Sequence, residues 1–450
     1  MNLSFTKDIF TKKSRSSILL LNVLASFFIK GWSALVVLIM VPLTLNCLGI
    51  YKNGVWLTLS SLLIWIDQMD IGLGNGLRNK LTSHIAHNNT EEARNIISST
   101  FAMLVIIMFP ILIILCSLSI YCDIYTFFNV DESIIPEFRT ALLVAITLVC
   151  MTFILKIIGN VYMGMQLPAV SNLILSLGQT VALIVSAILY YTNNATFMNI
   201  VIANTASPLL VYMMFYPYTF YIKFPQLKPT ISSINLRSAL ELGNIGLKFF
   251  WLQIAALIQF MTANILISRF FTPEMVTPYQ IAYRYMSIVM VFFSIVCMPF
   301  WNATTDAYER GDMEWIRNAS TKMNWLSLAV AVLLVILTVI SPFVYELWVE
   351  ENKDAVSLNM TAMMALYIFL MILSYRYSYF LNGVGALRLQ LYMTISSVVF
   401  IPLSWFVSYT THSIICFMAV MCVCNLPGII VNAIQFNKII NGKAKGIWRI

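Results

Sequence analysis

Long apolar runs recur along the whole chain and are separated by short polar stretches. A helix needs about 20 mostly apolar residues to cross the hydrocarbon core of a bilayer. Because the runs are continuously apolar rather than alternating, they predict helices and not the strands of a barrel. The predicted spans are 17–46, 53–76, 96–121, 138–163, 170–191, 199–220, 241–268, 279–303, 316–343, 358–380, 391–409 and 413–434. The pattern therefore predicts an all-α polytopic membrane protein with about 12 transmembrane helices.

Composition supports this interpretation. Hydrophobic residues make up 60% of the 450 positions and charged residues only 10%, whereas a soluble domain carries about a quarter charged residues. The first apolar run is far longer than the apolar part of a signal peptide, so it predicts a retained first helix. The eight cysteines lie mostly inside apolar runs and lack the spacing of a zinc site. We therefore expect no metal and no cofactor.

The distribution of Lys and Arg predicts the orientation. Most of those outside the spans lie on the side that carries both chain termini. The positive-inside rule then places both termini of this multi-pass protein in the cytoplasm. It also explains the net charge of +8 without a nucleic-acid partner.

A faint internal repeat divides the chain into two lobes. Three pairs of polar residues share an offset of 223 residues: Asn79 with Asn302, Arg94 with Arg317, and Asn95 with Asn318. Parallel repeats of this kind are common in transporters, with the substrate path between the lobes. The predicted parts are an N-terminal six-helix lobe at 1–221, a cytoplasmic linker at 222–240, a C-terminal six-helix lobe at 241–434 and a basic cytoplasmic tail at 435–450. The two lobes would surround a central cleft.

Ionisable residues inside the spans are the candidate site residues, because each costs about 2.5–3.5 kcal/mol at the bilayer centre unless it has a partner or a cavity. The cations, which would bind an anionic group of the substrate, are Lys30, Lys156, Lys248, Arg284 and Arg376. The acids, which would serve gating or ion coupling, are Asp67, Asp70 and Glu241. Two alternatives stay open: Lys156, Lys248 and Arg376 could snorkel to the headgroups, and the two aspartates could hold a loop.

Helical periodicity places several of these residues on polar stripes. Lys30 shares a face with Ser26 and Ser33, and Arg284 shares one with Gln280. Such stripes in both halves of the chain predict a hydrophilic, cation-rich cleft suited to an anionic substrate.

The glycine-rich run 71–80 follows a predicted membrane helix and not a strand, and no G-x-x-x-x-G-K-[ST] motif occurs in the chain. We therefore expect its glycines to break the second helix rather than to bind a nucleotide. His84, His87 and His412 fall in predicted loops, and no catalytic set is predicted at membrane depth, so we expect no enzyme.

The segment from Asp70 to Lys80 resembles a signature of bacterial polysaccharide-biosynthesis flippases. The segments from Gly311 to Asn318 and from Asn382 to Gln390 are similar to further parts of that family. These flippases belong to the multidrug/oligosaccharidyl-lipid/polysaccharide (MOP) exporter superfamily. Length, helix number, two lobes and cytoplasmic termini agree along nearly the whole chain.

The resemblance implies a monomeric flippase that moves a lipid-linked oligosaccharide repeat unit, usually on undecaprenyl pyrophosphate, across the inner membrane by alternating access. The product would serve O-antigen, capsule or another surface polysaccharide. Cavity cations of such flippases often lie on helices 1, 2, 7 and 8, and Lys30, Lys248 and Arg284 match by helix. Helix 2 carries acids here instead of a cation, which departs from that pattern.

The alternative function is a cation-coupled multidrug or metabolite antiporter of the same superfamily, with a proton or sodium gradient as its partner. It would need a coupling acid deep in a helix, whereas Asp67 and Asp70 are predicted toward the cytoplasmic end of helix 2. A membrane-embedded glycosyltransferase would need catalytic acids in a large external loop, and the predicted external loops are short.

Overall fold

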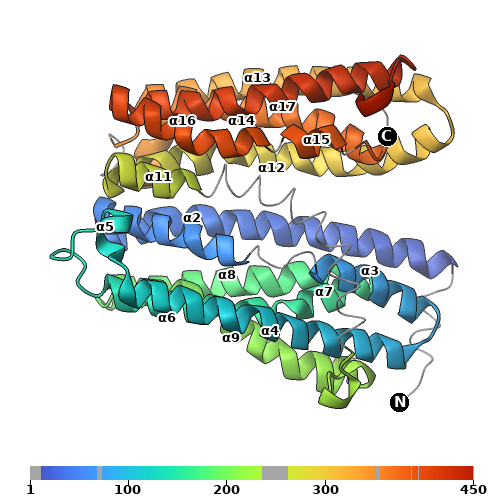
Figure 1. Ribbon diagram of the computed structural model, residues 1–450, viewed down its shortest axis with the longest axis horizontal. Helices are drawn as coiled ribbons and strands as arrows, with labels where there is room; N and C mark the ends of the chain where they lie inside the picture. The colour runs from blue at the N-terminus through green and yellow to red at the C-terminus, as the bar shows by residue number, and fades with distance from the viewer. Residues whose placement is uncertain are drawn as a thin grey trace. The chain divides into compact units, whose positions relative to one another are not determined.

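The computed structural model describes residues 12–67, 73–235, 262–350, 355–386, 388–393 and 395–448. Every regular element in these ranges is a helix (Figure 1). Among the described residues, eight helices are long and apolar enough to cross a membrane. The predicted fold class, an all-α polytopic membrane protein, is confirmed.

The chain divides into two compact units. Unit 1 comprises Met1–Gly49 and Leu63–Phe250, and unit 2 comprises Ile50–Leu62 and Trp251–Ile450. Apart from residues 50–62, unit 1 holds α2 (Lys12–Asp67), α3 (Leu73–Ala86), α4 (Thr90–Tyr121), α5 (Ile124–Phe128), α6 (Phe138–Leu155), α7 (Ile157–Gly164), α8 (Pro168–Tyr191), α9 (Phe197–Pro217), η1 (Tyr218–Lys223), η2 (Pro225–Leu227) and η3 (Ile231–Ser233). Unit 2 holds α11 (Thr262–Phe270), α12 (Pro273–Glu309), α13 (Met313–Val349), α14 (Leu358–Gly383), α15 (Arg388–Met393), α16 (Ile395–Thr411), α17 (Ile414–Ile440) and η5 (Gly446–Trp448).

The first two predicted spans are joined without a loop. They form α2, whose helical geometry is interrupted only at Gly49, with φ 68° and ψ 174°. Glycine adopts a positive φ readily because it has no Cβ. Residues 50–62 after this break belong to unit 2. There Gly54 lies against the Pro273 carbonyl so closely that an added Cβ would be 1.8 Å from its oxygen.

The glycine-rich run forms a helix and not a loop from Leu73 onward. Leu73, Leu77 and Leu81 are spaced four residues apart and are almost fully buried, so one apolar stripe drives α3 to fold against its neighbours. The predicted loop position of His84 is therefore wrong, because this residue lies in α3. On the neighbouring α7, the Gly164 carbonyl accepts a 2.8 Å hydrogen bond from Thr82 Oγ1.

The repeat extends to backbone geometry at one connection in each unit. Asn89 caps the N-terminus of α4, its Oδ1 accepting from a backbone amide at 3.2 Å. Asp312 caps α13 in the same way at 2.9 Å. The residues before the two caps have positive φ angles, 56° at Asn88 and 74° at Gly311. Both pairs are 223 residues apart, the offset predicted from the sequence.

A second match follows α7 and α14. The Leu167 amide donates to the Tyr162 carbonyl at 2.8 Å, and the Ala386 amide donates to the Leu381 carbonyl at 2.9 Å. These pairs are 219 residues apart. The second half is therefore four residues shorter between the two matched turns.

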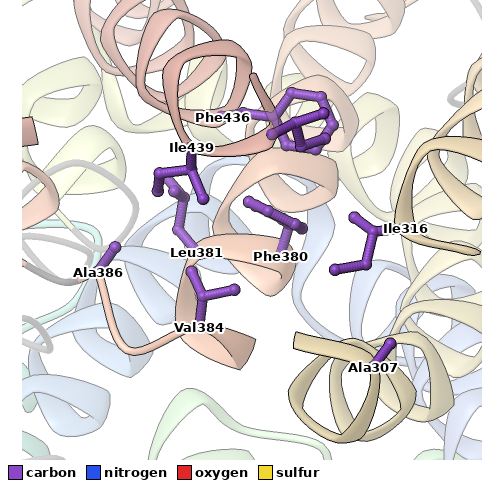
Figure 2. Close-up of a cluster of buried hydrophobic side chains, with 9 residues drawn as sticks. Ala307, Ile316, Phe380, Leu381, Val384, Ala386, Phe436 and Ile439 are labelled. Atoms are coloured by element: carbon purple, nitrogen blue, oxygen red, sulfur yellow. The ribbon is translucent and has the colours of Figure 1, made fainter. Parts of the chain in front are cut away.

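One end of unit 2 is closed by an apolar cluster drawn from α12, α13, α14 and α17 (Figure 2). Ile316, Phe380 and Leu381 are completely buried in it, and the rings of Phe380 and Phe436 meet edge to face with centroids 4.6 Å apart. Arg317 Nη2 donates to the Ile440 carbonyl at 3.2 Å. This contact satisfies a carbonyl in the last turn of α17, which extends beyond the predicted span into the predicted tail.

Candidate functional site

Unit 1 brings together two of the predicted site residues, Asp67 and Lys156. Lys156 Nζ lies 3.0 Å from Asp67 Oδ1 and also donates to the backbone carbonyl of the same aspartate. The side chains are 23% and 38% exposed, respectively. The pair joins α2 to the junction of α6 and α7.

The local chain explains how Lys156 reaches this position. The helix is interrupted at this residue between α6 and α7, and the Gly159 amide donates to the Lys156 carbonyl in a tighter, three-residue turn at 2.9 Å. The ammonium lies 4.6 Å from the centroid of the Phe153 ring, so a π-face supports its charge. A small hollow beside it is lined by Gly74, Leu104, Phe153, Lys156, Ile157 and Asn160.

Pairing lowers the electrostatic cost of placing these two charges in a membrane span. Isolated charges there are costly, and a paired lysine and aspartate carry no net charge. The contact therefore lets both charged groups lie at the end of a membrane span at a lower electrostatic cost.

Lys30 lies on α2 and is exposed in unit 1. Close to it, Trp32 Nε1 donates to Thr180 Oγ1 at 3.0 Å, and Ser33 donates to Gln179. These bonds fix the polar face of α2 against α8. The predicted role of Lys30 in binding an anion stays a prediction.

The two candidate cations that the structure describes in unit 2 have different surroundings. Arg376 is half-buried on α14, where its Nη2 donates to Ser320 Oγ at 3.4 Å and its guanidinium lies 4.7 Å from the Tyr377 ring centroid. Arg284 is half-buried on α12, one helical turn after Gln280.

Gln280 belongs to a buried chain of carboxamides inside unit 2. Its Nε2 donates to Asn264 Oδ1 at 2.7 Å, and Asn264 Nδ2 donates to Ser61 Oγ at 2.7 Å. This chain ties residues 50–62 to α11 and α12. Periodicity identified Gln280, but Asn264 could not be found from the sequence, because a single asparagine inside a predicted span has no distinctive pattern.

Three predicted site residues, Lys248, Asp70 and Glu241, lie outside the described residues. Among the residues that the structure describes, no group of His, Cys, Asp or Glu is arranged to hold a metal ion.

Solved structures share this architecture. An inward-facing multidrug resistance MATE family transporter of the MOP superfamily matches with a TM-score of 0.73 at 16% identity, over 91% of this chain and 95% of that one. An outward-facing transporter of the same description matches with a TM-score of 0.64 at 14% identity, over 95% of each chain. The fold is that of the MOP-superfamily transporters.

A third MOP transporter, from Pyrococcus furiosus, matches with a TM-score of 0.59 at 14% identity over 95% of each chain, and its description reports a binding pocket of reverse polarity. No family model matches the chain, and no curated protein matches it in sequence. These similarities support the predicted superfamily fold, whereas the flippase branch of that superfamily stays a prediction.

Proposed function

We propose that this protein is a proton-coupled transporter of the MOP fold that carries a small amphipathic organic solute. The observation that carries the proposal is the contact between Asp67 and Lys156. It provides a carboxylate at the end of a candidate membrane span, and a proton on this carboxylate would change the charge of the site.

The coupling follows from the two states of the pair. With Asp67 ionised, Lys156 is neutralised and α2 is held to the α6–α7 junction. A proton on Asp67 weakens this link and leaves a positive charge beside the hollow next to Asn160. A ligand can shift such an equilibrium only by its different affinity for the two states. An anionic group on the solute would prefer the released lysine, so solute and proton binding become linked.

The sign of the solute charge follows from the described site residues. In unit 1, Lys30 adds positive charge, and Asp67 is compensated by Lys156. We therefore propose that the solute is an amphipathic anion. The Pyrococcus furiosus neighbour, with its reported reverse polarity, supports the view that this fold accepts pockets of different charge.

The test uses the purified full chain in liposomes with an imposed pH gradient. A fluorescent amphipathic anion and an amphipathic cation of similar size are loaded in parallel, and efflux is followed with and without the gradient. Gradient-driven efflux of the anion is the expected result. If the efflux rates of both solutes are the same with and without the gradient, the proposal is overturned.

The second candidate is a flippase for a lipid-linked oligosaccharide. The excess of cations over acids among the described site residues favours it as well, because a pyrophosphate needs fixed positive charge. The two candidates separate in the same liposomes with a fluorescent polyprenyl pyrophosphate sugar. Movement of this lipid to the opposite leaflet, without efflux of the soluble anion, would favour the flippase.

A further inference from the structure

The segment from Tyr218 to Asn235, which we name the strap, is bound tightly to unit 1. Leu227 is completely buried. The amide of Thr230 donates to Ser98 Oγ at 3.1 Å, and the amide of Asn235 donates to Ser99 Oγ at 2.7 Å. Two backbone amides are thus held by two adjacent serines on α4, so the strap has a defined outer face.

That outer face is apolar. Tyr221, Ile222 and Ile231 are 58%, 71% and 89% exposed, although none of them is suited to water. Tyr221 and Ile222 lie at the end of the candidate membrane span Phe197–Lys223, on which Met213 and Met214 are also exposed. Exposed apolar surface that is continuous with a lipid-facing helix is typical of contact with the membrane boundary.

Basic groups border this apolar face. Lys228 Nζ lies 4.1 Å from the centroid of the Tyr221 ring, and Lys223 is exposed beside it. Aromatic rings with flanking lysines are characteristic of the headgroup region, where anionic lipids attract basic side chains.

The acidic residues of the supporting helix lie in its first turn. Glu91 and Glu92 are exposed at the start of α4, seven residues before Ser98 and Ser99. At 1.5 Å per residue, this separation is about 10 Å along the helix axis, or about one Debye length in physiological salt.

The same arrangement recurs in unit 2 after its last long helix. Lys438 Nζ on α17 lies 3.8 Å from the ring centroid of Trp448, whose carbonyl accepts a 3.5 Å bond from Gln435. The neighbouring Ile447 is 59% exposed. A lysine over an aromatic ring beside an exposed isoleucine therefore follows α9 in unit 1 and α17 in unit 2.

We propose that the strap binds the headgroup of an anionic phospholipid at the membrane surface where α9 ends. Lys223 and Lys228 contact the phosphate, while Tyr221, Ile222 and Ile231 enter the boundary between headgroups and acyl chains. This lipid site is separate from the exported solute, and its test requires no transport.

The test measures lipid retention by the purified full chain. Delipidated protein in detergent is given equal amounts of phosphatidylglycerol and phosphatidylcholine, and native mass spectrometry counts the bound molecules of each. Wild type is expected to prefer phosphatidylglycerol. The preference is expected to fall about fivefold for each of Lys223→Gln and Lys228→Gln, and to persist in Lys223→Arg/Lys228→Arg.

The matched control is Lys322→Gln, at an exposed lysine on α13. Its lipid preference is expected to equal that of the wild type. An unchanged preference in the Lys223→Gln/Lys228→Gln variant would overturn the proposal, as would an equal loss in Lys322→Gln. Monodisperse elution of each variant ensures that folded proteins are compared.

Discussion

Units 1 and 2 are built on the same repeat but stabilise their helices in different ways. In unit 1, an ion pair between Asp67 and Lys156 links α2 to the α6–α7 junction. In unit 2, the Arg376 guanidinium has a serine hydroxyl and a tyrosine ring as its partners. An ion pair can be switched by a proton, whereas a hydroxyl and a ring cannot. The proposed coupling role therefore uses the ion pair of unit 1.

The largest expected change in the free energy of unfolding comes from substituting closely packed glycines. In unit 2, Gly54→Ala would place a Cβ 1.8 Å from a backbone oxygen of Pro273, which cannot move alone. In unit 1, Gly159→Ala would meet the Ser171 hydroxyl at 2.8 Å, which can rotate away. We expect Gly54→Ala to lower the free energy of unfolding by about 3 kcal/mol and Gly159→Ala by about 1 kcal/mol or less. Unfolding in mixed detergent micelles measures both, and equal losses would contradict the packing account.

The next effect concerns the ion pair. Asp67→Asn leaves Lys156 without a carboxylate, and we expect a loss of about 2 kcal/mol in the free energy of unfolding, below that of a fully buried pair because both groups are partly exposed. Arg376→Gln removes a long hydrogen bond to a hydroxyl and should cost about 1 kcal/mol or less.

A double variant tests whether the ion pair itself is responsible. Asp67→Lys combined with Lys156→Asp restores opposite charges and should recover part of the stability that Asp67→Lys alone loses. The same micelle unfolding assay measures this recovery. Additive losses in the double variant would argue that the two residues act independently.

A smaller effect tests the repeat. Asn89→Ala and Asp312→Ala each remove an N-cap at equivalent positions, and we expect equal losses of about 1 kcal/mol in the free energy of unfolding. The controls are Asn89→Asp and Asp312→Asn, which keep an acceptor and should retain most of the stability. A loss confined to one unit would show that the two connections are not equivalent.

The smallest effect is the pH dependence of one helix cap in unit 1. Asp123 caps α5, and the hydrogen bond from the Thr126 side chain holds the pKa of its carboxyl below the ordinary value of 3.8. The cap is therefore fully present above that value and is lost as the pH falls through the lower folded pKa. In unit 2, α14 is capped by Ser357, which does not titrate in this range.

Amide hydrogen exchange measures this difference between the caps. We expect α5 to lose protection in acid while the first turn of α14 keeps it. Asp123→Ala should remove the pH dependence of α5. Parallel loss of protection at both caps would indicate general acid unfolding instead.

Much of the fold could be predicted, because long apolar runs in a chain with few charges have one physical solution in a bilayer. The kink at Gly49, where the first two spans meet without a loop, could not be predicted. A single glycine gives no sign that the next helix begins immediately after it. The leucine stripe of α3 was hidden by the glycines around it. Lys156 and Asp67 could each be identified as costly charges, but their contact spans 89 residues and depends on a tertiary register that periodicity does not contain.

The most direct test of the coupling role of Asp67 is gradient-driven efflux by wild type, Asp67→Asn and Arg376→Gln in liposomes. Efflux of the amphipathic anion is measured at equal protein content, with and without the pH gradient. The account predicts that wild type and Arg376→Gln respond to the gradient, whereas Asp67→Asn gives the same slow efflux in both conditions. A wild-type response to the gradient in Asp67→Asn would contradict the account.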